Sequence, residues 1–352
     1  MFQSIFGGIQ RRYGGVSGGF GTSQVLSYVL RVKHGDSFVG MLDGRDAMWG
    51  LEERKNCGVV NIVAFVEDSA VNGEDNLPEK LRRIFVQRFE TLIEHKRDQY
   101  RKGLLKRNRA FGYYFWTDDL NIKASDYIRL VEPESRGVNL SELEIRELAG
   151  RITTANLPYN HSALWEIVVF SKPILGDKRN VLKYPVEVNL KLENAFATPM
   201  ERIPLKPCVQ LDDPSRQQKL INNLAAMKQT TKILRSTSNL LITHLITISL
   251  AAAFPMPILK YLSKLFHITA SVSAMPMLKK NLQVGPYELK DMIFWPPAFG
   301  SVGLNFSLFV YGNQLQLALL ADRSVLGTVR EGMYLLEEIM SEIERMDTVM
   351  GE

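Results

Sequence analysis

Five histidines are the side chains in this sequence best suited to act as a general base near neutral pH, because imidazole titrates in that range. No two of them are adjacent, and they stand at His34, His95, His161, His244 and His267. His161 lies between Asn160 and Ser162, and His34 precedes Gly35, so both are typical of turn or capping residues. His244 lies in an apolar run and is typical of a hydrogen-bonded core residue. The sequence therefore assigns no catalytic residue.

Other reactive side chains do not form a recognised motif either. The two cysteines, Cys57 and Cys208, are far apart and form no Cys-x-x-Cys pair, so neither a disulfide framework nor a metal site is predicted, and a reducing compartment fits best. There is no Gly-x-Ser-x-Gly elbow and no glycine-rich phosphate loop. Serine hydrolase and nucleotide-binding functions are therefore not supported.

The positive charge of the chain suits an acidic partner. The chain has 352 residues and a net charge of +5, which fits nucleic acid, an anionic membrane surface or a phosphorylated cofactor. Eleven lysine and arginine residues gather between positions 80 and 109. They indicate either a solvated helix face or a surface for anionic lipid or for the phosphates of coenzyme A. No RNA-binding pattern accompanies the aromatic run Tyr113–Trp116, so no nucleic-acid partner is predicted.

Hydrophobic periodicity predicts strands and helices mixed in both halves of the chain, which indicates an α/β or α+β architecture of two lobes. A buried strand is expected at Val59–Val66, and a helix is expected over Leu81–Ile93 with a basic face that continues to Arg109. The remaining expected elements are a strand at Tyr113–Trp116, a hairpin formed by Val302–Ser307 and Leu315–Leu320, and a terminal helix over Met333–Met346.

The predicted organisation is a flexible glycine-rich arm over residues 1–25, an N-terminal lobe over 26–186 and a C-terminal lobe over 187–352. The longest apolar run, Leu240–Phe254, is shorter than the roughly 20 residues of a membrane-spanning helix and is interrupted by polar groups. We expect it to form a buried or interfacial helix that ends at Phe254, before Pro255.

Several stretches, taken in order, carry a family resemblance. They are Leu42–Trp49, Leu157 and Pro158 with Leu164–Val169, Leu192–Phe196 with Ile203–Leu205, and Phe294–Pro297 with Gly303, Leu304, Ser307, Tyr311–Asn313, Ala321 and Asp322. Together they resemble the animal branch of the wax ester synthase and diacylglycerol acyltransferase family, over roughly residues 40 to 345. The resemblance implies a two-lobed fold like that of chloramphenicol acetyltransferase, with an active-site tunnel between the lobes.

The resemblance also implies a His-His-x-x-x-Asp-Gly motif whose second histidine is the general base, and this chain lacks it. Lys183–Val186 resembles the strand that leads into the motif, and Leu192–Phe196 already resembles a landmark well beyond it. We therefore expect a deletion between about Val186 and Leu190 that leaves the fold incomplete in the middle and truncates the start of the second lobe. Alternative splicing, a missed exon and true loss in a diverged copy would each explain it.

Two functional hypotheses follow from the resemblance. The first is an O-acyltransferase that moves a fatty acyl group from acyl-CoA to diacylglycerol or a long-chain alcohol, with this chain an inactive product because the motif is absent. The second is a non-enzymatic lipid-binding or regulatory paralogue or splice form. In both, acyl-CoA and a lipid or membrane surface are the expected partners, and no cofactor is bound. We expect peripheral attachment to an intracellular membrane: the endoplasmic reticulum, a lipid droplet or the inner face of the plasma membrane.

Overall fold

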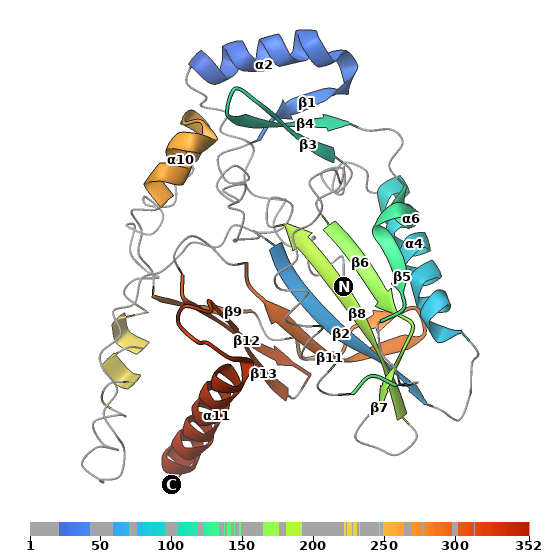
Figure 1. The fold of residues 1–352 in the computed structure, drawn as a ribbon, viewed down its shortest axis with the longest axis vertical. Helices are drawn as coiled ribbons and strands as arrows, with labels where there is room; N and C mark the ends of the chain where they lie inside the picture. The colour runs from blue at the N-terminus through green and yellow to red at the C-terminus, as the bar shows by residue number, and fades with distance from the viewer. Residues whose placement is uncertain are drawn as a thin grey trace.

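The computed structural model describes residues 21–42, 59–69, 76–95, 105–118, 123–133, 165–175, 181–191, 249–263, 269–275, 278–297, 302–312 and 314–351, and single positions between 137 and 148 and between 222 and 246. Strands in this part of the chain form three sheets, with helices on their outer sides (Figure 1). The mixed α/β class predicted from the sequence is confirmed.

The largest sheet has seven strands and draws on both halves of the chain. Its order is β10 (Gln283–Val284), β11 (Tyr287–Trp295), β2 (Val59–Ser69), β8 (Val181–Lys191), β6 (Trp165–Phe170) and β5 (Ile128–Val131), with β7 (Ile174–Leu175) paired to β8. The predicted strand at Val59–Val66 is β2, and its run of β-branched residues suits a central position between β11 and β8.

Helix α4 (Leu77–His95) covers one face of this sheet and confirms the helix expected over Leu81–Ile93 (Figure 1). It begins directly after Asn76, with Pro78 in its first turn, where a missing backbone N–H costs nothing. Its buried side chains Leu81, Phe85 and Phe89 belong to the main core cluster. The short helix α6 (Ala124–Tyr127) lies on the same side (Figure 1) and adds Ala124 and Tyr127 to that core.

A three-stranded sheet of order β1 (Phe38–Met41), β4 (Tyr113–Asp118) and β3 (Leu105–Ala110) lies between two helices. Helix α2 (Gly21–His34), followed by the 3₁₀ turn η1 (Gly35–Ser37), packs Leu30 against Phe38 and Phe115. Helix α10 (Met256–Ser263) packs Met256 and Leu259 in the cluster that contains Tyr114 and Trp116.

The β3–β4 turn is a two-residue connection in which Phe111 and Gly112 both have positive φ, at 52° and 82°. Two positive φ angles are typical of a type I′ turn, and they strain a bulky residue such as Phe111. A Cβ at Gly112 would lie 2.9 Å from the Cβ of Pro255, so glycine also permits the close approach of α10. The Gly112 carbonyl accepts a hydrogen bond from the Met256 amide at 2.8 Å.

The third sheet has the order β13 (Gln314–Ala321), β12 (Leu304–Tyr311) and β9 (Ala270–Ala274), followed by the terminal helix α11 (Val329–Gly351). Tyr311 lies opposite Gln314, which confirms the predicted hairpin, and α11 confirms the predicted C-terminal helix. Phe309 and Tyr311 join the main core beside Phe294 of β11, so this sheet packs against the large one.

Two details of the sequence-based interpretation change. Helix α4 ends at His95, and residues 105–110 form strand β3, so the prediction of a basic helix face that continues to Arg109 was wrong: Lys106, Arg107 and Arg109 lie on a strand. The helical residues before Pro255 end at Ala253, one residue earlier than expected, and α10 begins at Met256. Residues 240–245, 247 and 248 of the apolar run lie outside the described residues.

The expected boundary between residues 186 and 187 falls inside strand β8, which pairs with β2 along its whole length. In addition, β11 from beyond that boundary extends the large sheet through β2, and α10 covers the small sheet. Hydrogen bonds and core packing therefore connect the two halves of the chain. The division into an arm and two lobes stays a prediction, and residues 1–20 of the arm lie outside the described residues.

Candidate functional site

A row of buried polar side chains crosses the large sheet on the face opposite to α4. Asn61 of β2 lies opposite Asn189 of β8, and Asn189 lies opposite Glu166 of β6. Glu187 precedes Asn189 by two residues and so points to the same face of the sheet. All four side chains are buried. We call Asn61, Glu166, Glu187 and Asn189 the polar row.

Glu166 has a charged partner. Arg129 of β5 donates from Nε to Glu166 Oε1 at 2.5 Å, and the two side chains form an ion pair in which Glu166 is buried and Arg129 is half exposed. Because a buried carboxylate needs a countercharge, this pair accounts for the burial of Glu166. The ion pair leaves Glu187 as the second carboxyl of the polar row.

Burial raises the pKa of Glu187 to about 7, since desolvation disfavours the charged carboxylate. The hydrogen bond donated by Asn189 Nδ2 acts in the opposite direction, the neighbouring Glu166 raises the pKa further, and Arg129 lowers it. A carboxyl that titrates near neutral pH can accept and return a proton under physiological conditions. Glu187 is therefore the described side chain best suited to acid–base chemistry.

Two amide oxygens of the polar row have no hydrogen-bond donor within the described structure. They are Asn61 Oδ1 and Asn189 Oδ1, both completely buried. The amide nitrogens are oriented elsewhere, because Asn61 Nδ2 approaches the Val59 carbonyl at 3.4 Å and Asn189 Nδ2 donates to Glu187. An unpaired buried polar group costs roughly 1–3 kcal/mol of folding free energy. The polar row therefore contains two hydrogen-bond acceptors that lower the stability of the fold while they lack a donor.

An apolar cluster continues the polar row along the same face of the sheet. Val63 and Phe65 of β2 pack with Ile293 and Trp295 of β11. Trp295 lies directly opposite Asn61, and Val63 lies directly opposite Glu187. The face opposite to α4 thus combines buried hydrogen-bond acceptors with an adjoining apolar wall.

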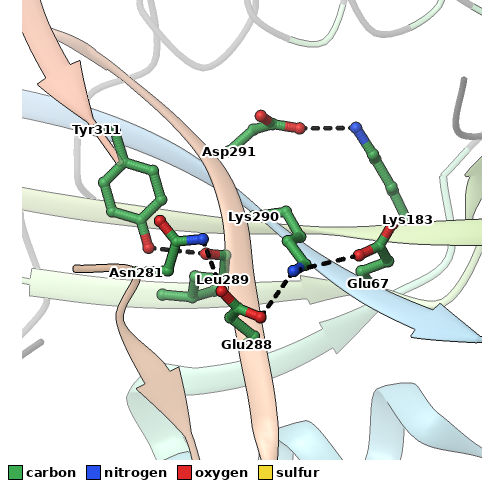
Figure 2. A network of polar contacts seen from close by, with 8 residues as sticks. All are labelled: Glu67, Lys183, Asn281, Glu288, Leu289, Lys290, Asp291 and Tyr311. Atoms are coloured by element: carbon green, nitrogen blue, oxygen red, sulfur yellow. Dashed lines mark hydrogen bonds and ion pairs between the residues drawn. The ribbon is translucent and has the colours of Figure 1, made fainter. Parts of the chain in front are cut away.

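A second polar network lies toward the opposite end of β11 and is fully paired (Figure 2). Lys290 contacts Glu288 at 2.7 Å and Glu67 at 3.7 Å, and Lys183 donates to Asp291 at 2.7 Å. The hydrogen bond from Lys290 is the largest cause of the lowered pKa of Glu288. These pairs connect β11 to β2 and β8.

Tyr311 completes this network from β12. Its hydroxyl donates to the Leu289 carbonyl at 2.8 Å, and Asn281 Nδ2 donates to Glu288 at 2.6 Å (Figure 2). The same hydroxyl accepts a hydrogen bond from the Leu282 amide at 2.7 Å. Because opposite charges face each other throughout, the network is best explained as a structural connection between the two sheets. The polar row is the better candidate for ligand chemistry.

Of the histidines and cysteines considered from the sequence, the structure describes His34 and His95, which lie on helices and not in the polar row. His34 ends α2 with its ring 5.1 Å from that of Phe115, and His95 ends α4. His161, His244, His267 and both cysteines lie outside the described residues. Among the described residues, no group of three or more His, Cys, Asp or Glu side chains could hold a metal ion.

Sequence reasoning missed the polar row, although a signal for it was present. In β8, Glu187 and Asn189 alternate with the apolar residues Val186, Val188 and Leu190. A buried strand with polar residues at every second position points those groups to one face. The expected deletion site between about Val186 and Leu190 is part of this continuous strand, and the absence of a segment there stays a prediction.

Comparisons with known proteins support the assignment of the fold. Residues 208–346 match the family model described as the WS/DGAT C-terminal domain. The wax ester synthase/diacylglycerol acyltransferase from Marinobacter aquaeolei VT8 is similar with a TM-score of 0.55 and 14% identity, over 87% of this chain and 99% of that one. At this identity the likeness concerns the fold alone, and it confirms the predicted fold class.

A weaker likeness involves the first condensation domain of the calcium-dependent antibiotic synthetase. Its TM-score is 0.43 at 10% identity, over 85% of this chain and 93% of that domain. No curated protein matches the sequence.

Proposed function

We propose that this protein is of the wax ester synthase and diacylglycerol acyltransferase type, with acyl-CoA and a hydroxyl-bearing lipid as its ligands. The observation that carries the proposal is the match of residues 208–346 to the WS/DGAT C-terminal domain. The similar fold of the Marinobacter enzyme over most of both chains supports it. The polar row and its apolar wall give the large sheet a face suited to a lipid with a polar end.

We further propose that this chain does not carry out acyl transfer at a useful rate. The adjacent histidines implied by the family resemblance are absent from the sequence, and loss of a positioned general base typically costs about 10²- to 10⁴-fold in rate. Purified protein with labelled oleoyl-CoA and either dioleoylglycerol or hexadecanol should yield no ester above a boiled control. Clear turnover would contradict the proposal, and its loss in Glu187→Gln would identify Glu187 as the base.

A non-enzymatic lipid-binding or regulatory role is the alternative, and the absence of a histidine pair favours it for this chain. An incomplete enzyme product and a diverged paralogue differ in what the gene encodes. A longer form of the protein with two adjacent histidines after Val186 would indicate an enzyme gene with this chain as an incomplete product. Absence of such a form would favour a diverged paralogue.

Peripheral association with a lipid surface is also part of the proposal. None of the helices among the described residues is long and apolar enough to cross a membrane. Helix α2 nevertheless exposes an apolar stripe at helical spacing, formed by Val25, Tyr28, Val29 and Val32, on the side turned away from its buried residue Leu30. Arg31 and Lys33 flank this stripe, and α2 contains no acidic residue.

This arrangement is typical of a helix that lies in the plane of a membrane interface, with its basic side chains toward anionic headgroups. Phe111, 79% exposed at the tip of the β3–β4 turn, offers a further apolar anchor. The α4 face is less suited than the sequence suggested, because Arg82 and Arg83 both contact Glu79 and Arg82 also donates to the Ile128 carbonyl.

Cosedimentation with neutral and anionic liposomes tests this anchor. Val29→Glu with Val32→Glu places two charges in the stripe and should weaken binding more than about tenfold, since burial of each valine contributes about 1.5 kcal/mol or more. The matched control is Arg83→Glu with Arg88→Glu on the exposed side of α4, which should leave binding nearly unchanged. The opposite ranking of the two double variants would exclude α2 as the anchor.

A further inference from the structure

The outer face of the third sheet is apolar along all three of its strands. Ser307 and Phe309 of β12 are buried toward the large sheet, where Ser307 Oγ donates to the Phe294 carbonyl at 2.5 Å. Because side chains alternate along a strand, the residues between them point outward. The outward side chains are Leu304, Phe306, Leu308 and Val310 of β12, Leu315, Leu317, Leu319 and Ala321 of β13, and Ala270, Val272 and Ala274 of β9. None of these side chains is buried, and soluble proteins rarely leave so continuous an apolar surface open.

Helix α11 lies against one strand of this face. A Cβ at Gly332 would lie 3.8 Å from Leu319 Cδ2, which places the start of the helix over β13. The helix then runs away from the sheets toward the C-terminus (Figure 1). On β9, at the other edge of the sheet, Val272 is 65% exposed. The contact with α11 therefore leaves the outer face incompletely covered.

The apolar face of α11 is itself only half covered. Its members recur at helical spacing and span about 160° of the helix surface at 100° per residue. They are Met333, Leu335, Leu336, Ile339, Met340, Ile343 and Met346, and none of them is buried. A stripe of about 100° is sufficient for one packing partner. The width of this face therefore fits two partners, β13 and a further element.

The charge of α11 restricts what the further element can be. The helix contains six acidic and two basic residues, so its net charge is −4. Glu337 and Glu344 are exposed, are seven residues apart and form one border of the apolar face. These charges would repel an anionic lipid surface and would equally repel α11 of a second copy. The surface therefore fits a helix with an apolar stripe and a basic border.

The chain contains a segment of this kind at residues 216–235. It has five basic residues and no acidic residue: Arg216, Lys219, Lys228, Lys232 and Arg235. Its apolar residues Leu220, Leu224, Met227 and Leu234 recur at the spacing of one helix face. Lys228 and Arg235 border that face and are seven residues apart, as Glu337 and Glu344 are.

The described positions of this segment are helical and exposed. They are 222, 224–226, 228–230 and 232, and Thr230 Oγ1 donates to the Ala226 carbonyl at 2.8 Å, one turn earlier. Leu224, on the apolar stripe, is 41% exposed. The match to the WS/DGAT C-terminal domain covers residues 208–346, so the segment, the third sheet and most of α11 belong to one matched unit.

We propose that residues 216–235 form a basic amphipathic helix that docks in its own chain between α11 and the outer face of the third sheet. The stripe containing Leu224 covers the open apolar surface, and Lys228 and Arg235 pair with Glu337 and Glu344. This inference concerns a surface that the proposed acyl transfer does not use, and it holds whether or not the protein binds acyl-CoA.

Cross-linking of the full chain tests which surface the segment contacts. A zero-length carbodiimide joins a lysine amine to a carboxylate only where the two are in contact. Peptides that connect Lys228 with Glu337 or Glu344 are expected by mass spectrometry. Absence of links between the segment and α11, with links from Lys228 to other acidic residues instead, would overturn the docking site.

The same experiment on an equal mixture of ¹⁴N- and ¹⁵N-labelled protein identifies the chain that supplies the helix. Linked peptides should be entirely light or entirely heavy. Pairs of one light and one heavy peptide would show that a second copy supplies the helix, and would overturn the assignment to the same chain.

Hydrogen exchange of α11 tests the charge pairing. Lys228→Glu with Arg235→Glu should speed amide exchange in α11 at least about tenfold, because the docked helix no longer protects it. Glu337→Lys with Glu344→Lys should have a similar effect. Combination of all four substitutions restores opposite charges and should return exchange to within about twofold of wild type. Failure of the combination to restore protection would contradict the pairing.

The matched control is Arg83→Glu with Arg88→Glu on α4, which also reverses two basic charges and should leave exchange in α11 unchanged. Cooperative melting of each variant shows that it is folded. Cosedimentation with anionic liposomes provides the last comparison. If Lys228→Glu with Arg235→Glu abolishes liposome binding and leaves exchange in α11 unchanged, the segment is a membrane anchor and the docking proposal is wrong.

Discussion

The two faces of the seven-stranded sheet differ although they come from the same strands. On the face toward α4, Val186, Val188 and Trp165 join one continuous apolar core. On the opposite face, Glu187 and Asn189 alternate with those valines and form the buried polar row. Apolar packing dominates the first face. The second contains groups that cost free energy of folding, and such groups are expected where a protein binds a ligand.

The largest effect should follow from loss of a core side chain on the α4 face. Trp165 is buried, with its ring centroid 4.3 Å from that of Phe89 and 5.5 Å from that of Tyr127. Trp165→Ala should lower the free energy of unfolding by about 3–5 kcal/mol, because it removes apolar contact and leaves a cavity. Urea denaturation measures this, and the exposed Phe111→Ala is the control, expected within about 0.5 kcal/mol of wild type. A Trp165→Ala cost below that of Phe111→Ala would mean that α4 does not cover this face.

An effect of intermediate size should appear at Glu187 and depend on pH. The pKa of this carboxyl rises from 4.5 to about 7 in the folded protein, so the folded state holds the proton more tightly than the unfolded state. The stabilising contribution of the protonated form is complete below pH 4.5 and is lost as the pH rises through 7. Glu187→Gln cannot ionise and should be more stable than wild type by roughly 1–3 kcal/mol at pH 8.

Thermal or urea unfolding of both proteins between pH 4 and pH 8 measures this difference. The wild-type curve should fall over the range and the Glu187→Gln curve should be flatter, so that the two separate as the pH rises. Parallel curves would show that Glu187 is not held in a desolvated environment, and the contrast between the two faces would then be weaker.

The smallest effect, opposite in sign to the first, should follow from replacement of an unpaired amide. Asn61→Leu removes a buried oxygen that has no donor in the described structure and loses only a 3.4 Å contact to Val59. We expect unchanged or increased stability, by up to about 1 kcal/mol, in the ligand-free protein. A loss of more than about 2 kcal/mol in the same urea assay would mean that Asn61 Oδ1 has a donor in the folded protein.

Particular elements show how far the sequence could be interpreted. Three elements were predicted correctly: the strand at Val59–Val66, the helix over Leu81–Ile93 and the C-terminal hairpin. Each has a pattern of apolar residues within its own segment that is typical of its secondary structure. The basic helix was extended too far. The basic residues continue into β3, and a run of charged residues does not by itself distinguish a helix from a strand.

The polar row could not be assembled from the sequence for a different reason. Its members come from β2, β6 and β8, more than a hundred residues apart at the extremes, and they meet only through strand register. A register shift of one residue would turn Asn189 and Glu187 toward α4. The same is true of β11, which joins β2 from the far end of the chain.

The sequence by itself determined the mixed α/β class, most local elements and the absence of adjacent histidines, since these depend on residue type and short-range spacing. Only the tertiary structure decided which polar residues share a face, how burial raises the pKa of Glu187, and that the amide oxygens of the cross-strand partners Asn61 and Asn189 are buried without a donor in the described structure. The physical reason is that desolvation and hydrogen-bond satisfaction belong to the assembled sheet and not to any one strand.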